Sequence, residues 1–144
     1  MNEGARILLV EDDERDVALV MMALAECHPA DRIAVARNGV EALDYLYRRG
    51  GYATRAPGDP LVVLLDLKLP KVDGLEVLRQ VKGDDRLRCI PIVVLTSSLE
   101  ERDVRASYEL GANAYVAKAV DFHAFVDALK QTSSFWTMIN QPPP

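Results

Sequence analysis

The stretch ILLVEDD, residues 7–13, decides the fold, because four aliphatic residues run without alternation into three consecutive acids. An unbroken aliphatic run of this kind is typical of a parallel strand that is covered on both faces. Four further short apolar runs follow along the chain, at Ile33–Ala36, Leu61–Leu65, Ile92–Leu95 and Ala114–Ala117. The sequence therefore predicts five short strands.

Helical patterns alternate with these strands. Apolar residues spaced three and four apart mark five helices, within Val17–Leu24, Val40–Tyr47, Leu75–Val81, Val104–Leu110 and Phe122–Leu129. This alternation predicts an α/β fold with a doubly wound, five-stranded parallel sheet, strand order 2-1-3-4-5, and helices on both faces. Asp13 is expected to cap the first helix, and Ser98 with Glu101 has the spacing of a capping box for the fourth.

Length and composition narrow the class of protein. A chain of 144 residues, 49% hydrophobic, is sufficient for one compact domain. The net charge of -5 argues against a nucleic-acid binder. The longest apolar run, Val17–Ala25, is too short to span a bilayer, and we expect no secretory signal before it. Two cysteines without metal-ligand spacing are expected to be reduced thiols, so we expect a cytoplasmic protein. His28 and His123 lack ligand or nucleophile partners and are expected to be surface or partly packed residues.

Acids follow two of the predicted strands, at the point where strand order reverses. The first strand ends in Glu11 and Asp12, and the third ends in Asp66. In an open sheet of this type, ligands bind outside the carboxyl ends of the strands at that reversal. A lone aspartate after a strand is usually a turn former or helix cap, but three acids at two adjacent strand ends are harder to explain in that way. A cluster of carboxylate oxygens suits Mg²⁺, so the sequence predicts an acidic magnesium pocket.

Two more strand ends supply a hydroxyl and a cation. Thr96 ends the fourth strand, and Lys118 follows the fifth. Either residue alone reads more simply as a helix cap or a solvated strand end. Together with the acidic pocket, they form a set suited to binding a phosphoryl group, with a nucleophile, a metal, a hydrogen-bond donor and a cation.

Four segments resemble the receiver domain of bacterial response regulators, in the order and at the spacing of that family. They are ILLVEDD (residues 7–13), LLDLKLPKVDG (residues 64–74), VVLTSS (residues 93–98) and GANAYVAK (residues 111–118). The resemblance covers residues 5–132, and residues 133–144 are expected to form a C-terminal helix extension and a mobile tail.

The resemblance implies a role for each residue of the acidic pocket. Asp66 is the expected phosphoacceptor, and it takes a phosphoryl group from the phosphohistidine of a sensor histidine kinase. Asp12, Asp66 and the backbone carbonyl of Lys68 would hold Mg²⁺, with Glu11 acting through water. Such a protein catalyses its own phosphorylation and dephosphorylation and is not a turnover enzyme. Its effect passes to a downstream protein that the sequence does not name.

The switch residues follow from the same resemblance. Thr96 would donate its hydroxyl to one phosphoryl oxygen, Lys118 would pair with another, and Tyr115 would turn inward as Thr96 moves. The family usually has a proline after this lysine, often through a cis bond, whereas this chain has Ala119. A cis bond before a non-proline residue costs about 2.5–4 kcal/mol, so the isomer of this bond is open.

The C-terminal segment resembles that of the small single-domain regulators that partner bacterial phytochrome kinases. Phe135 and Trp136, the acids of the first strand and the insertion Gly50–Pro60 carry this resemblance, which implies a bacteriophytochrome partner and a homodimer. Phe135, Trp136 and Ile139 are the candidate dimer residues, because Trp136 and Ile139 continue the stripe of the last helix and aromatic residues are enriched at interfaces. The alternative is that Phe135 and Trp136 cap the core of their own domain.

Three other functions compete with this interpretation. A receiver-like scaffold that acts without phosphorylation would typically lack the aspartate, threonine or lysine found here. A phosphatase of the haloacid dehalogenase type would need a second acid two residues after the nucleophile, where this chain has Lys68, and a longer chain that includes a cap domain. A flavin-binding module would need a phosphate-cradling loop after the first strand, where this chain has acids.

Overall fold

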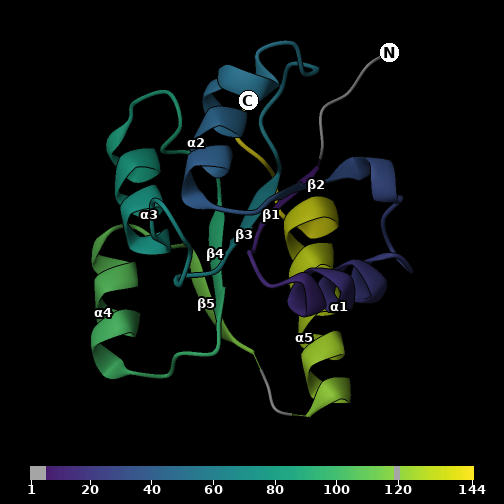
Figure 1. Ribbon diagram of the computed structural model, residues 1–144. Coiled ribbons are helices and arrows are strands. Elements are labelled where there is room, and N and C mark those ends of the chain that lie inside the picture. Colours follow the sequence, from purple (N-terminus) through teal and green to yellow (C-terminus); the bar gives the residue numbers. More distant parts are fainter. Residues whose placement is uncertain (1–5, 119–120) are drawn as a thin grey trace.

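The computed structural model describes residues 6–118 and 121–144. Five parallel strands form one sheet in the order β2-β1-β3-β4-β5, which confirms the predicted fold class and topology (Figure 1). The strands are β1 (Ile7–Val10), β2 (Ile33–Ala36), β3 (Val62–Leu65), β4 (Ile92–Thr96) and β5 (Ala114–Ala117). Their bounds agree with the sequence prediction to within one residue.

Five α-helices connect and cover the strands. They are α1 (Glu14–Leu24), α2 (Gly39–Tyr47), α3 (Gly74–Gly83), α4 (Glu101–Glu109) and α5 (Phe122–Ser134). Helices α1 and α5 lie on one side of the sheet, and α2, α3 and α4 lie on the other (Figure 1). Alternate residues of each central strand therefore face two different helical layers.

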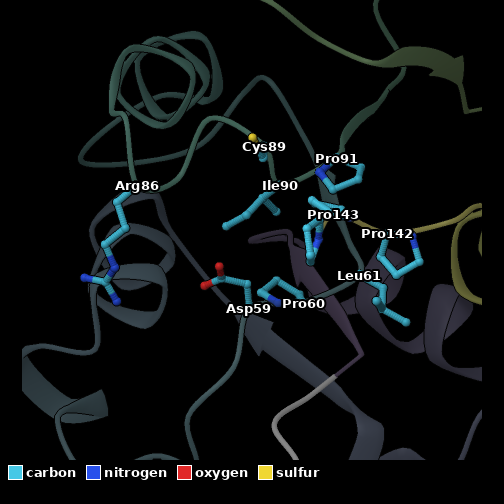
Figure 2. A pocket seen from close by; sticks show the side chains of 10 residues that line it. Asp59, Pro60, Leu61, Arg86, Cys89, Ile90, Pro91, Pro142 and Pro143 are labelled. Carbon is cyan, nitrogen blue, oxygen red and sulfur yellow. The ribbon is translucent and has the colours of Figure 1, made fainter.

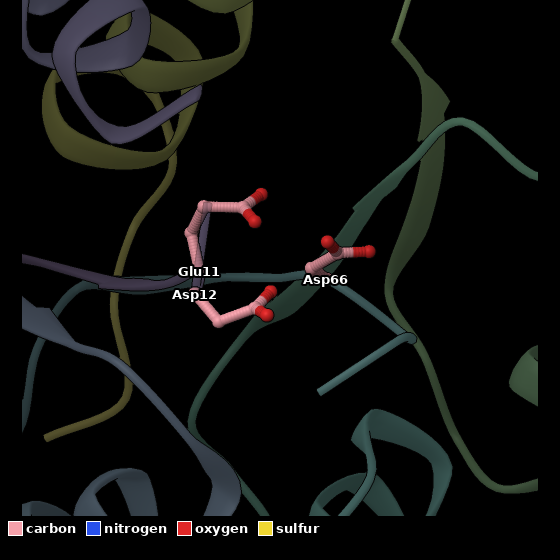
Figure 3. Close-up of side chains that lie close together, drawn as sticks. All are labelled: Glu11, Asp12 and Asp66. Carbon is pink, nitrogen blue, oxygen red and sulfur yellow. The ribbon is translucent and has the colours of Figure 1, made fainter. Parts of the chain in front are cut away.

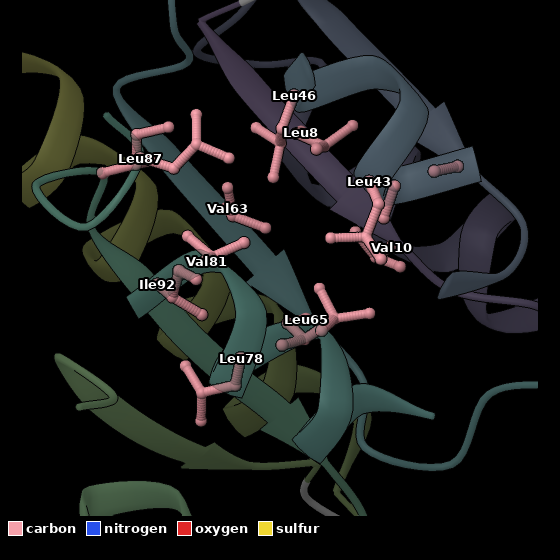
Figure 4. Packing of buried hydrophobic residues seen from close by; sticks show 14 of the residues in the cluster. Leu8, Val10, Leu43, Leu46, Val63, Leu65, Leu78, Val81, Leu87 and Ile92 are labelled. Atoms are coloured by element: carbon pink, nitrogen blue, oxygen red, sulfur yellow. The ribbon is translucent and has the colours of Figure 1, made fainter. Parts of the chain in front are cut away.

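Each layer has its own apolar core. In β1, Leu8 and Val10 pack with α2 and α3, whereas Ile7 and Leu9 pack with α1 and α5. Figure 4 shows the first of these cores, in which leucine and valine side chains of the strands meet those of the two helices. The central strands are buried on both faces, which explains their unbroken aliphatic runs.

The capping prediction was right for α1 and wrong for α4. The side chain of Asp13 accepts hydrogen bonds from the amides of Arg15 and Asp16, at 2.8 and 3.1 Å. Helix α4 begins at Glu101 rather than directly after Ser98. The Ser98 hydroxyl instead accepts from the amide of Glu100 at 3.3 Å and donates to Asp103 Oδ2 at 2.5 Å. Ser98 therefore organises the loop before the helix.

His28 is buried, with 3% of its surface exposed, which corrects the expectation of a surface or partly packed residue. It follows α1, and its amide donates to the carbonyl of Leu24. Among residues 6–118 and 121–144, its Nε2 atom has no hydrogen-bond partner. Burial lowers the pKa of His28, and the nearby charge of Arg6 lowers it further.

We expect His28→Leu to make protein stability less sensitive to acid. As pH falls below the ordinary histidine value of 6.5, the unfolded chain takes up a proton that folded His28 resists, so the free energy of unfolding decreases. Thermal unfolding at about pH 8 and about pH 5.5, on either side of that value, measures the loss. The loss should be smaller in His28→Leu than in the wild type. The matched control is His123→Gln, because His123 is exposed; if it gives the same reduction as His28→Leu, the prediction is wrong.

The C-terminal segment continues α5 in the wider turns of a π-helix, Phe135–Ile139. A hydrogen bond joins this extension to the N-terminal part of the chain, because the carbonyl of Thr137 accepts from the side chain of Arg6 at 2.7 Å. Residues 142–144 then line a cavity of about 540 Å³ at the amino ends of β3 and β4, beside Asp59 and Arg86 (Figure 2). This cavity lies at the opposite end of the strands from the predicted acidic pocket.

Within the described part of the chain, no helix is both long and apolar enough to cross a membrane.

Candidate phosphoacceptor site

The register of the sheet brings the acids of β1 and β3 to the same level. Val10 of β1 pairs with Leu65 of β3, so that Glu11 and Asp66 leave adjacent strands together. The amide of Asp66 still donates to the carbonyl of Val10, at 3.1 Å. Both acids are held by the ends of rigid strands, and the expectation of a shared pocket is met.

Glu11, Asp12 and Asp66 form an acidic cluster at this edge. One carboxylate oxygen from each lies within 4.8 Å of the other two. Figure 3 shows these three side chains at the edge of the sheet. Glu11 and Asp66 are buried, and Asp12 is exposed. Three hard oxygen donors, one of them open to solvent, fit a divalent cation that keeps part of its water shell.

Lys118 lies between the acids. Its Nζ is 2.6 Å from Glu11 Oε2, 2.8 Å from Asp16 Oδ2 and 3.3 Å from Asp66 Oδ2. The lysine reaches this position because β5 ends beside β4, where Thr96 pairs with Ala117 and the amide of Lys118 donates to the carbonyl of Thr96. Lys118 therefore binds two acids of the cluster region, Glu11 and Asp66, together with Asp16. Its expected contact with a phosphoryl oxygen stays a prediction.

The site carries more negative charge than Lys118 can balance. Burial raises the pKa of Glu11 to about 7, the hydrogen bond from Lys118 opposes this rise, and the charge of Asp66 adds to it. Burial by itself would lower the pKa of Lys118. Its hydrogen bonds with Asp16 and Glu11 and the charge of Asp66 outweigh burial, so that its pKa is raised. Burial is thus the main cause of the Glu11 shift, and the surrounding carboxylates are the cause of the Lys118 shift. A bound cation would offset the charge of these carboxylates.

Thr96 and Tyr115 lie on the strands that flank the acidic cluster. Thr96 is buried at the end of β4, next to β3, and its hydroxyl accepts from the amide of Ser98 at 3.4 Å. The hydroxyl of Tyr115, on β5, donates to the carbonyl of Ser98 at 2.7 Å. Both candidate switch residues therefore contact the loop that leads into α4.

Two further positions singled out in the sequence are Lys68, whose surroundings the structure describes, and Ala119, which lies outside the described residues. The amide of Lys68 lies 3.4 Å from Asp66 Oδ1, and its side chain is exposed, while Glu11 pairs with Lys118. The peptide bond between Lys118 and Ala119 reaches outside the described residues, so its isomer stays open.

Asp16 is the site residue that sequence reasoning missed. It lies in the first turn of α1, where an acid is common because it complements the helix dipole. Its contact with Lys118 joins residues 102 positions apart, and no local pattern signals such a contact.

The sequence matches the response regulator receiver domain over residues 7–130. The chain belongs to this family and is a response regulator of two-component signalling. It is 41% identical to the "Probable methanogenesis regulatory protein FilR2" of Methanothrix harundinacea over 139 residues, covering 95% of this chain and 86% of that protein. It is 40% identical to the response regulator Rcp1 of Synechocystis over 130 residues, covering 90% of this chain and 87% of that protein.

Solved structures of phytochrome response regulators resemble it over their whole length. The phosphorylated cyanobacterial phytochrome response regulator RcpA superimposes with a TM-score of 0.89 at 37% identity, covering both chains fully. The Mn²⁺-bound form of Rcp1 gives 0.86 at 39% identity, covering 96% of this chain and 98% of that one. The bacteriophytochrome response regulator AtBRR gives 0.75 at 55% identity, covering 98% and 99%. These similarities agree with the predicted resemblance to single-domain phytochrome regulators.

Proposed function

We propose that Asp66 is the phosphoacceptor of this response regulator and that Asp12 and Asp66 hold Mg²⁺ beside it, with Glu11 acting through water. The carrying observation is the gathering of these three carboxylates within 4.8 Å around the end of β3. An oxygen of Asp66 attacks the phosphorus of a phosphohistidine, the P–N bond breaks, and the imidazole leaves with the bonding electron pair. Magnesium supplies charge neutralisation to the phosphoryl oxygens when bound. The carbonyl of Lys68 and a water held by Glu11 complete the proposed ligands.

Lys118 and Thr96 then stabilise the product. Phosphorylation of Asp66 replaces one negative charge with nearly two, beside an ammonium that already lies 3.3 Å from the carboxylate. Thr96 donates its hydroxyl to another phosphoryl oxygen and gives up its contact with the amide of Ser98. Since Tyr115 is bound to the carbonyl of the same serine, movement of this loop is transmitted to β5 and α4. This is the proposed switch in protein–protein interaction.

Incubation with acetyl phosphate and Mg²⁺ tests the proposed function. We expect the intact mass to rise by one phosphoryl group, and the added group to be removed by hydroxylamine, as for an acyl phosphate. Chelation of the metal with EDTA should prevent the modification. A wild-type protein that takes up no phosphoryl group, or does so equally well with EDTA, would contradict the proposal.

We further propose that the donor is a bacterial phytochrome histidine kinase. The support is the likeness to the regulators RcpA and AtBRR over nearly their whole chains. Transfer from a phosphorylated bacteriophytochrome kinase should be faster than transfer from a histidine kinase without a phytochrome sensor. Equal rates would remove the support for this partner.

A homodimer through the C-terminal extension is the remaining proposal. Phe135 and Ile139 are 44% and 72% exposed, whereas Trp136 is half-buried against the core that α1 and α5 share. The two rings of Phe135 and Trp136 meet edge to face, with centroids 5.0 Å apart. Trp136 thus packs the extension against the domain's own core, and Phe135 and Ile139 offer apolar surface to a second copy.

We expect Ile139→Asp to convert the dimer to a monomer, because a charge at the centre of an apolar contact is costly to desolvate. The measurement is the solution mass by light scattering at micromolar concentration. Leu99→Asp is the matched control, since Leu99 is 74% exposed but lies in the loop before α4, and it should leave the mass unchanged. A monomeric wild type, or an unchanged mass for Ile139→Asp, would rule out this interface.

A further inference from the structure

Asp16 shares the ammonium group of Lys118 with the proposed phosphoacceptor. Lys118 Nζ is 2.8 Å from Asp16 and 3.3 Å from Asp66, so the contact with Asp66 is the longer of the two. Glu11, at 2.6 Å, is the third acceptor. An ammonium has three N–H groups, and these three carboxylates account for all of them. A phosphoryl oxygen on Asp66 can take over the N–H group that Asp66 Oδ2 now accepts, but any second hydrogen bond to the phosphoryl group must draw Lys118 away from Asp16 or Glu11.

Asp16 is the partner of Lys118 that lies outside the candidate cation site. The acidic cluster consists of Glu11, Asp12 and Asp66, and Asp16 is outside it. A divalent ion at the cluster offsets the charge of Glu11 and Asp66, which weakens their hold on the lysine. The charge of Asp16 is not offset in this way. Its side chain is 37% exposed and that of Lys118 is 13% exposed, so the pair is only partly screened by water.

A helix-dipole role does not account for this contact. Glu14 lies in the same first turn of α1 and complements the dipole equally well, yet it points to Arg37 and is 79% exposed. Asp16 instead faces the sheet edge and reaches a residue of β5's terminal segment. Glu14 and Asp16 therefore share the favourable interaction with the helix dipole, but only Asp16 contacts Lys118.

We propose that Asp16 is a positioning residue that competes with the phosphoryl group of Asp66 for Lys118 and thereby limits how tightly the phosphorylated state is held. This inference rests on the proposed function of the site. In the unmodified protein, Asp16 keeps the ammonium near the acceptor. After phosphorylation, Asp16 keeps one hydrogen bond from Lys118, and this N–H group is then not available to the phosphoryl group.

Binding of beryllofluoride in the presence of Mg²⁺, which mimics the phosphoryl group on an aspartate, tests the proposal. We expect Asp16→Asn to bind it about fivefold more tightly than the wild type, the effect of one partly exposed ion pair. Asp16→Glu, which keeps the charge, should return the affinity toward the wild-type value. Glu14→Gln is the matched control and should change the affinity little. Calorimetric titration gives the constants, and thermal unfolding checks that each variant is folded.

A Lys118→Ala background separates positioning from simple electrostatics. If Asp16 acts through the lysine, Asp16→Asn should have no effect on beryllofluoride affinity in that background. An effect that persists there, a matching effect of Glu14→Gln, or unchanged or weaker binding by Asp16→Asn would overturn the positioning role. Failure of the wild type to bind beryllofluoride would instead refute the proposed function itself.

Discussion

Asp66→Asn is expected to abolish phosphorylation by acetyl phosphate completely. The substitution keeps the size and shape of the side chain at the end of β3, but an amide oxygen does not form an acyl phosphate under these conditions. No other carboxylate in the cluster is placed as Asp66 is, on β3 beside Lys118 and next to the strand that carries Thr96. The measurement is the intact mass after incubation with acetyl phosphate and Mg²⁺.

Asp73→Asn is the matched control for this experiment. Asp73 follows the same strand and caps α3 by accepting a hydrogen bond of 2.9 Å from the amide of Glu76. Asparagine is an equally good capping residue, so this variant should fold and take up the phosphoryl group. If Asp66→Asn is modified to the same extent as the wild type, the acceptor is another residue and the site assignment is wrong.

Gly74→Ala is expected to reduce the free energy of unfolding by about 3 kcal/mol, the upper part of the range for an overpacked site. A Cβ atom at Gly74 would lie 2.2 Å from the carbonyl oxygen of Asp66 and 2.5 Å from Cα of Leu67. Both neighbours belong to the backbone, and a flexible side chain cannot move aside to relieve the clash. The start of α3 must then shift away from β3, and the backbone of Asp66 shifts with it.

Urea denaturation measures this loss, and Gly83→Ala at the other end of α3 is the control. A Cβ atom at Gly83 meets no other atom within 4 Å, so alanine there should be neutral or stabilise the helix by about 0.5–1 kcal/mol. Equal midpoints for the two variants would contradict the steric argument. Phosphorylation of Gly74→Ala can also be measured without urea, at a temperature where the variant is folded. Reduced phosphorylation there would show that the close packing of Gly74 against the backbone of Asp66 also positions Asp66.

The fold could be predicted from local patterns because the central strands β1, β3 and β4 are covered on both faces. Continuous aliphatic runs, helical stripes and the acids after the first and third strands all point to one topology. The acidic cluster follows from that topology alone, since the register that pairs Val10 with Leu65 brings Glu11 beside Asp66. Only the distances had to come from the coordinates.

The errors were confined to positions where tertiary contacts override a local pattern. Ser98 has the spacing of a capping box, but Tyr115 holds its carbonyl and Asp103 binds its hydroxyl, so the helix starts later. His28 has no sequence feature of a core residue, yet the end of α1 turns it inward. For Ser98 the deciding contact comes from β5, whereas for His28 it is the turn that follows α1.

The sequence by itself determined the class of fold and, for the common strand order 2-1-3-4-5, the residue types that meet at the carboxyl edge of the sheet. These follow from hydrophobic periodicity and from the rule that parallel strands present their carboxyl ends together. The tertiary structure decided how Lys118 divides its three hydrogen bonds, and that Asp16 receives one of them. The physical reason is that differences of tenths of an ångström, between elements far apart in the chain, decide which groups an ammonium binds. Hydrophobic periodicity shows only which face of an element is buried.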